Sequence, residues 1–136
     1  MKIIIITQNE PFFLKDNFSY LITLLNNDIE IAGVIVNDVS PFGKKESFLK
    51  KSIRTLNIFG FNFFVFYTFK FIKSFLFSKD LKSFLKKKKI PIIELNKSIN
   101  ASSSISIIKS YNPDLLVSIL GNQIFKSKII NLAPMG

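Results

Sequence analysis

Lys2-Ile-Ile-Ile-Ile-Thr7, followed by Gln8-Asn-Glu-Pro11, decides the fold of this chain. A short run of β-branched residues that ends in a polar, proline-containing loop predicts a strand that is buried on both faces. A second, nearly continuous apolar run, residues 29–36 with Gly33 inside it, predicts another such strand. Strands of this kind are typical of parallel sheets covered by helices, so the two runs favour an α/β fold.

Helical periodicity separates these two strands and follows the second one. Five apolar residues lie on one helical stripe, and Asn26-Asn-Asp28 closes that helix. The stripe consists of Leu14, Phe18, Leu21, Ile22 and Leu25. Residues 46–89 are predicted to be helical throughout, with one stripe at Leu49, Ile53 and Leu56 and another at Leu81, Phe84 and Leu85.

The last third of the chain repeats the alternation of strand and helix. Residues 90–95 predict a short third strand, and residues 114–120 predict a fourth, after a helix that ends near Tyr111-Asn-Pro113. Residues 124–132 predict one more short helix. The order implies a Rossmann-like parallel sheet with flanking helices in a single domain, residues 1–136, which is expected to be incomplete at its C-terminal side.

Composition excludes several kinds of site. The chain has no cysteine and no histidine, so disulfides, zinc-thiolate sites and cysteine nucleophiles are excluded, as are Ser-His and Cys-His pairs. No metal site is predicted. The apolar run after Lys2 is too short for a signal peptide, which favours a cytoplasmic location.

The excess positive charge lies in one segment, the basic aromatic insertion at residues 44–89. Of the 19 Lys and Arg residues behind the net charge of +10, thirteen lie there, against Glu46 and Asp80. An A/T-rich gene would produce the same bias toward Lys and Phe. Its uncharged stretch, Thr55 to Phe69, is shorter than the roughly 20 residues of a spanning helix, so no transmembrane segment is predicted.

Three roles are open for this insertion. It could pack against the sheet or a partner subunit, lie on an anionic membrane surface with aromatic residues such as Phe63, Phe64 and Phe71, or bind nucleic-acid phosphates through its lysines. Because residues 44–89 contain a single arginine, Arg54, bidentate phosphate recognition is limited, and no RNA-binding module is recognisable.

Loops at the carboxyl ends of parallel strands are the usual ligand sites. In this chain, the loops after the first, second and fourth predicted strands are residues 8–11, 37–43 and 120–123. The first lacks the G-x-G-x-x-G pattern of dinucleotide sites, and the chain has no P-loop. In the last, Gly121 would let the backbone approach a planar ligand, and two neighbouring amides can donate and accept hydrogen bonds. A simple polar turn is the alternative.

Two C-terminal segments, Asn112-Pro-Asp-Leu-Leu116 and Leu132-Ala-Pro-Met-Gly136, carry a family resemblance. Together with the strand-helix-strand start and Ile90-Pro-Ile-Ile93, their order resembles the 10-formyltetrahydrofolate-dependent formyltransferases, which include methionyl-tRNA formyltransferase and the sugar-nucleotide N-formyltransferases. The resemblance implies transfer of a formyl group from 10-formyltetrahydrofolate to an amine, with a sugar-nucleotide amine as the first expectation and aminoacyl-tRNA as the second.

The resemblance also implies site residues. In the family, the segment after the fourth strand lines the folate pocket, which assigns Asn122, Gln123 and Ile124 to cofactor binding. The loop after the first strand faces the substrate, which assigns Asn9 and Glu10 to substrate contact. The family's catalytic Asn-x-His pair and distant Asp are expected beyond Gly136, so this chain alone is expected to be inactive.

Two further expectations concern association. The chain is expected to expose a sheet edge and a hydrophobic face, and therefore to be poorly soluble or to oligomerise. The alternative function is a non-catalytic basic module that associates with a membrane surface or an anionic partner through residues 44–89.

Overall fold

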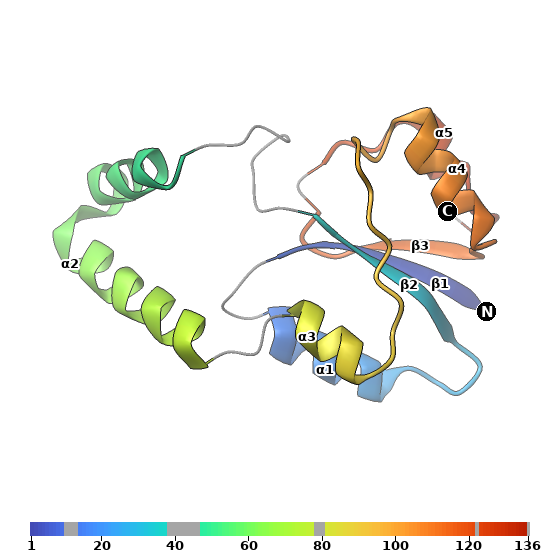
Figure 1. The fold of residues 1–136 in the computed structure, drawn as a ribbon, viewed down its shortest axis with the longest axis horizontal. Coiled ribbons are helices and arrows are strands. Elements are labelled where there is room, and N and C mark those ends of the chain that lie inside the picture. Colours follow the sequence, from blue (N-terminus) through green and yellow to red (C-terminus); the bar gives the residue numbers. More distant parts are fainter. Residues whose placement is uncertain (10–13, 38–46, 78–80, 122, 136) are drawn as a thin grey trace.

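A three-stranded parallel sheet forms the centre of the computed structural model, which describes residues 1–9, 14–37, 47–77, 81–121 and 123–135 (Figure 1). The central strand β1 (Lys2–Gln8) pairs with β2 (Glu30–Asn37) on one side and with β3 (Leu115–Ser118) on the other. The predicted parallel α/β architecture is therefore confirmed.

Helices cover both faces of this sheet, which gives three layers. The helices α1 (Leu14–Leu24) and α3 (Leu81–Lys87) lie on one face, and α4 (Ser102–Ser110) and α5 (Ser127–Ile130) lie on the other (Figure 1). The predicted short helix within residues 124–132 is α5.

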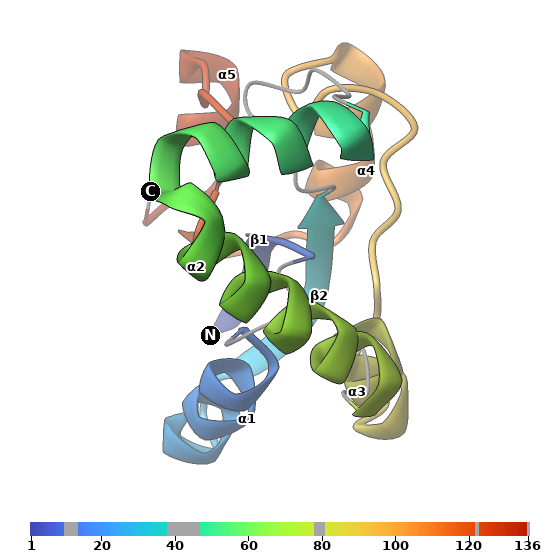
Figure 2. The same cartoon turned by 90° about the vertical axis from the view of Figure 1, so that its left-hand side faces the viewer.

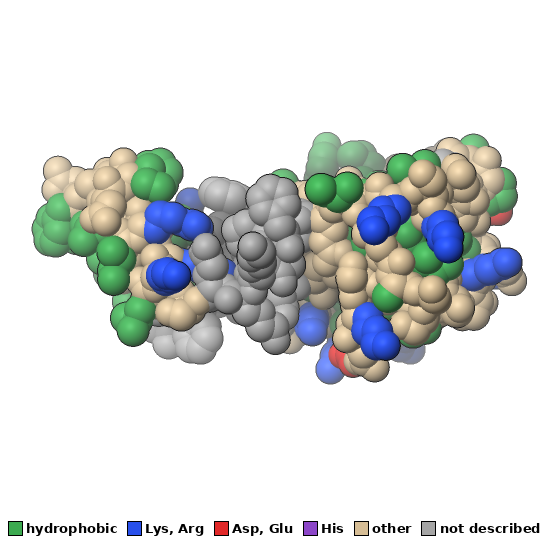
Figure 3. Space-filling model, turned by 90° about the horizontal axis from the view of Figure 1, so that it is seen from above, with side chains coloured by type: hydrophobic (Ala, Val, Ile, Leu, Met, Phe, Trp, Pro, Cys, Tyr) green, Lys and Arg blue, Asp and Glu red, His purple; other side chains and the backbone are tan. Residues whose placement is uncertain are grey.

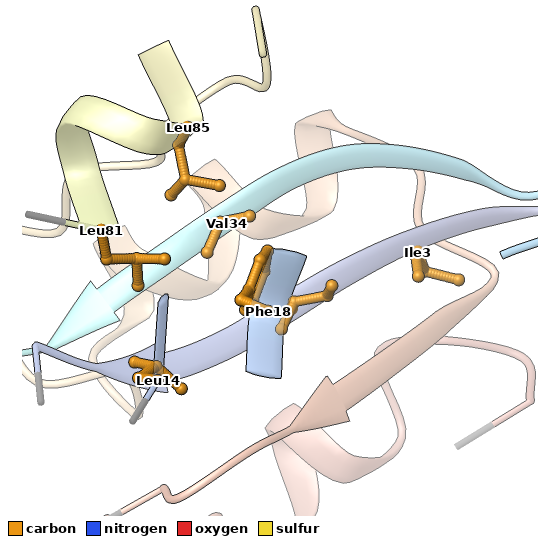
Figure 4. Packing of buried hydrophobic residues seen from close by; sticks show 7 residues of the cluster. Ile3, Leu14, Phe18, Val34, Leu81 and Leu85 are labelled. Carbon is orange, nitrogen blue, oxygen red and sulfur yellow. The ribbon is translucent and has the colours of Figure 1, made fainter. Parts of the chain in front are cut away.

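The isoleucine run of β1 supplies both cores because successive side chains of a strand point to opposite faces. One core contains Ile3, Ile5, Leu14, Phe18, Val34, Leu81 and Leu85 (Figure 4). The other contains Ile4, Ile6, Ile35, Ile93, Ile99, Ile108 and Ile129. The predicted stripes of α1 and α3 are confirmed, since Leu14, Phe18, Leu81 and Leu85 are buried.

The predicted third strand, residues 90–95, is wrong as a full strand. Only one parallel bridge forms there, between Val34 and Ile92. It is held by two hydrogen bonds, from the Val34 amide to the Pro91 carbonyl and from the Ile93 amide to the Val34 carbonyl, both 2.9 Å. Pro91 has no amide hydrogen to donate, which limits the length of the pairing.

Asp114 joins the beginning of β3 to the beginning of β1. Its carboxylate accepts a hydrogen bond of 2.6 Å from the Lys2 amide, and its own amide donates to the Lys2 carbonyl at 2.8 Å. Its carbonyl accepts from the Met135 amide at 3.0 Å. The two C-terminal segments that were singled out in the sequence therefore lie side by side at the amino end of the sheet.

The helix α2 (Phe48–Phe77) stands apart from these layers, beyond the carboxyl ends of the strands (Figures 1 and 2). The predicted helix over residues 46–89 is thus divided into α2 and α3, and residues 44–46 and 78–80 lie outside the described part. Packing of α2 against the sheet is contradicted: none of its described side chains is buried, and Leu49 and Ile53 of the expected packing stripe are 72% and 59% exposed.

Candidate functional site

The carboxyl edge of the sheet gathers polar residues from all three strands. β1 ends at Thr7 and Gln8, β2 ends at Asn37, and the chain leaves β3 after Ser118. Because the strands are parallel, these ends lie on one edge, which faces α2 in Figure 1. The amide of Asn9 donates to the Asn37 carbonyl at 2.8 Å and so holds the first two ends together.

Three buried polar atoms belong to this edge and to the loop after β3. They are Thr7 Oγ1, Asn37 Nδ2 and Gln123 Oε1, and none has a hydrogen-bond partner among the described residues. A buried polar atom without a partner costs about 1–3 kcal/mol, so such atoms are few in native proteins. By the alternation of the strands, Thr7 continues the face of Ile3 and Ile5, whereas Asn37 continues the face of Ile35, so these two side chains lie on opposite faces of the sheet. The Asn37 nitrogen can donate a hydrogen bond to a polar ligand, and the Gln123 oxygen can accept one.

The loop after β3 has an unusual backbone. Leu120 has a φ of 53°, a left-handed conformation that is rare for a bulky side chain and costs about 1–2 kcal/mol. Lys89 and Asn112 have the same left-handed conformation away from this loop, with φ values of 57° and 48°. A Cβ added at Gly121 would collide with the Ser118 hydroxyl, so the close approach at this glycine is to the protein's own side chain.

Asn100 fixes the far end of the same loop. Its Nδ2 donates to the Ile124 carbonyl at 2.8 Å, and its Oδ1 accepts from the Lys126 amide at 2.9 Å. One side chain that precedes α4 thereby sets the path of the backbone on both sides of Phe125. Gln123 lies one residue before this clamp.

Of the five site residues predicted from the sequence, three lie in the described part of the chain. Gln123 is partly buried with its side-chain oxygen turned inward, whereas Ile124 is 73% exposed and contributes its carbonyl to the clamp. Asn9 is exposed at the carboxyl edge. Glu10 and Asn122 lie outside the described residues.

Sequence reasoning missed Thr7 and Asn100, and it placed Asn37 in a ligand-site loop without assigning it a role. Thr7 and Asn37 had a usable signal, since each is a polar residue at the end of an apolar strand, where ligands of parallel sheets bind. Asn100 had none, because its partners lie 24 and 26 residues away along the chain.

Replacing Asn100 with alanine is expected to speed amide hydrogen exchange at Lys126 by about fivefold to tenfold, since it removes a hydrogen bond of roughly 1–1.5 kcal/mol. Exchange measured by NMR checks this. Asn100→Asp is the comparison variant: it keeps an oxygen acceptor for Lys126, and it replaces the donor to Ile124 with a second oxygen that repels the Ile124 carbonyl. Unchanged exchange at Lys126 in Asn100→Ala would contradict the clamp.

No group of three or more acidic residues in the described ranges is placed to hold a metal ion, and the sequence has no histidine or cysteine. The candidate site therefore offers amides, hydroxyls and backbone groups.

Comparison with known proteins identifies no family for this chain. Neither a scan of protein-family models nor a search of curated proteins returns a match.

Proposed function

We propose that residues 1–136 form the N-terminal, folate-binding part of a Rossmann-like formyltransferase, a cytoplasmic enzyme that moves a formyl group from 10-formyltetrahydrofolate to an amine. One observation carries the proposal. Gln123, which the family resemblance assigns to the folate pocket, has a buried side-chain oxygen without a partner among the described residues. Thr7 and Asn37, at the ends of the two neighbouring strands, have the same property.

The chemistry of these atoms suits the polar edge of a pterin ring. Such a ring presents hydrogen-bond donors and acceptors side by side; the Gln123 side-chain oxygen can accept a hydrogen bond from it, and the Asn37 amide can donate one. When bound, 10-formyltetrahydrofolate supplies the one-carbon group, and this chain's residues hold and orient it. The Asn100 clamp keeps the loop of Gln123 in place.

The arrangement of the resembling segments also supports the proposal. Asn112 to Leu116 leads into β3, and the Met135 amide bonds the Asp114 carbonyl at the start of that strand. A strand that ran from Met135 parallel to β3 would reach the same carboxyl edge as Gln123. We propose that the family's Asn-x-His strand takes this position in the full enzyme.

Under this proposal, binding and catalysis are divided between segments. The present sequence has no histidine, so the groups that polarise the formyl carbon and accept the amine's proton belong to the Asn-x-His strand and the distant Asp. Asn9, on the carboxyl edge, is proposed to contact the acceptor. A sugar-nucleotide amine is the first candidate acceptor, and aminoacyl-tRNA is the second.

Gln123→Ala is expected to weaken binding of 10-formyltetrahydrofolate at least tenfold in a protein that joins this chain to an Asn-x-His strand, because the buried acceptor would be lost. Isothermal titration calorimetry with the folate measures the change. Ser103→Ala, an exposed hydroxyl on α4, is the control and is expected to bind normally.

Two outcomes would refute the proposal in different ways. Unchanged affinity in Gln123→Ala would remove Gln123 from the folate site. A coding sequence in which no Asn-x-His strand follows residue 136 would remove the transferase itself and leave a binding module.

A further inference from the structure

The helix α2 is a bent hairpin rather than one straight rod. Its bend lies at Gly60, whose φ of 79° and ψ of 172° belong to a region that is essentially reserved for glycine. The two arms run from this bend back toward the rest of the molecule, and the bend is the part of α2 farthest from the sheet (Figures 1 and 2).

An aromatic ladder crosses the bend and joins the two arms. The rings of Phe59 and Phe63 lie 4.7 Å apart between centroids, and those of Phe63 and Tyr67 lie 5.8 Å apart. Aromatic pairs at such distances are favourable beyond the area they bury. The ladder therefore supports a defined bent shape.

The outer end of the hairpin is apolar and open to solvent. Its exposed apolar residues are Ile58 (63%), Phe59 (58%), Phe61 (70%), Val65 (49%), Phe66 (65%) and Phe69 (73%). Figure 3 shows hydrophobic side chains at this end of the molecule. Within the described residues, Leu49–Lys73 is the one helix long and apolar enough to cross a membrane, and none of it is buried. An exposed apolar patch of this kind marks an interaction site.

Positive charge brackets the apolar end. Lys50, Lys51 and Arg54 lie on the first arm, Lys70 and Lys73 lie on the second, and the sequence of α2 contains no acidic residue. On the face seen in Figure 3, basic side chains lie closer to the sheet than the hydrophobic end does. Apolar side chains flanked by lysines are typical of helices that bind anionic membrane surfaces.

The fold excludes a single crossing of a membrane by α2. β2 precedes this helix and α3 follows it, and Val34 of β2 packs in one core with Leu81 and Leu85 of α3. A helix that crossed the bilayer once would put these elements on opposite sides. Both ends of α2 must therefore remain on the same side of a membrane.

The dimensions of the arms fit one leaflet. At 1.5 Å per residue, the bend lies about 9 Å along the helix from Arg54 and about 15 Å from Lys70. Half of a bilayer's hydrocarbon core is about 15 Å thick. A hairpin of this size can insert its apolar end while its basic residues stay among the headgroups. Asn57 and Asn62, which are exposed and flank the bend, oppose burial of the bend in hydrocarbon, so the insertion is expected to be shallow.

We infer that α2 docks the protein on a membrane with anionic headgroups, as a hairpin inserted into one leaflet and bent at Gly60. Charge complementarity selects the lipid: the described residues 47–77 contribute five positive charges and no negative charge. The carboxyl edge of the sheet lies on the same side of the molecule as α2, so docking turns the candidate site toward the membrane (Figure 1). The inference does not depend on the proposed transferase activity.

Flotation with vesicles tests this docking. The full chain is expected to float with vesicles of phosphatidylglycerol and phosphatidylcholine, and more weakly with phosphatidylcholine alone. Phe61→Ser with Phe66→Ser is expected to lower the floating fraction at least tenfold, because two exposed apolar anchors are lost. Leu24→Ser, which replaces a 62% exposed leucine on α1, is the matched control and is expected to float normally.

Charge-reversal variants and a measurement of oligomeric state complete the test of membrane docking. Lys50→Glu with Lys73→Glu is expected to reduce flotation with anionic vesicles and to leave the weak flotation with neutral vesicles unchanged. Failure to float overturns the inference, as does unchanged flotation of the Phe61→Ser, Phe66→Ser variant. A dimer in light scattering that dissociates on these phenylalanine substitutions, without flotation, assigns the apolar end to a second copy of the chain instead.

Single-cysteine labelling distinguishes a hairpin from a spanning helix, since the natural sequence has no cysteine to interfere. In sealed vesicles, a membrane-impermeant maleimide added outside is expected to label Leu49→Cys and Lys73→Cys fully and Phe61→Cys at least tenfold more slowly. Protection of either Leu49→Cys or Lys73→Cys would show a crossing and overturn the hairpin.

Discussion

Replacing Phe18 with alanine is expected to lower the free energy of unfolding by about 3–5 kcal/mol. Phe18 is 1% exposed and belongs to the buried cluster that α1 forms with the central strand, together with Ile3, Ile5 and Leu14. Figure 4 shows Phe18 between α1 and the sheet. Truncation removes the apolar contacts and leaves a cavity between helix and sheet. Small domains have about 5–15 kcal/mol of stability in total, so this one change would remove a large part of it.

Urea denaturation monitored by circular dichroism measures the loss, with two controls. Leu24→Ala on the same helix removes a side chain that is 62% exposed, and Phe61→Ala removes a phenylalanine that is 70% exposed. Both are expected to change stability by less than about 0.5 kcal/mol. A loss below about 1 kcal/mol in Phe18→Ala would contradict the packing of α1. A comparable loss in Phe61→Ala would show that α2 is structural.

The sequence predicts the layers of the fold well because β1 and α1 follow simple periodicities. Ile3 to Ile6 alternate between the two cores, and Leu14 and Phe18 recur at the helical period. Each pattern records which faces of one element are buried, and it does so even where the covering residues, such as Ile108 and Ile129, are far away in the sequence. Local patterning therefore reveals the parallel sheet and the helices on its faces.

Residues 90–95 and α2 show the limit of this reasoning. An apolar stripe on a helix indicates an apolar contact surface but does not identify the surface that covers it. Leu49 and Ile53 form such a stripe, yet both are exposed in the structure. The bend at Gly60 depends on backbone dihedral angles that a glycine permits and does not require. For residues 90–95, the β-branched composition led to the prediction of a full strand. Pro91, whose missing amide hydrogen limits pairing, was given too little weight in that prediction.

The candidate site, too, could be predicted from the sequence only in part. The rule that ligands bind at the carboxyl ends of parallel strands predicts a site at the loop of Gln123, and folate remains the proposed ligand of that loop. Asn100 could not be found, because its hydrogen bonds join segments that only the folded chain brings together. Long-range side-chain contacts leave no periodic signal.

Gly33→Val is expected to destabilise the fold by about 3 kcal/mol, at the upper end of the range for overpacking a buried site. A Cβ at Gly33 would lie 2.6 Å from Ile93 Cδ1 and 2.7 Å from Ile93 Cγ1, with the Pro91 carbonyl oxygen 3.6 Å away. Ile93 is 3% exposed and has little room to move. Thermal and urea unfolding measure the change.

A double-mutant cycle shows whether Gly33 is needed for this contact. Ile93→Ala removes three carbon atoms and Gly33→Val adds three, so the pair conserves volume at the contact. Ile93→Ala alone is expected to cost about 2–4 kcal/mol. The double variant is expected to be more stable than the sum of the two single changes predicts, by at least about 1 kcal/mol. Additive losses would show that Gly33 does not pack against Ile93. The bridge of residues 91–93 to β2 would then depend on its hydrogen bonds to Val34 alone.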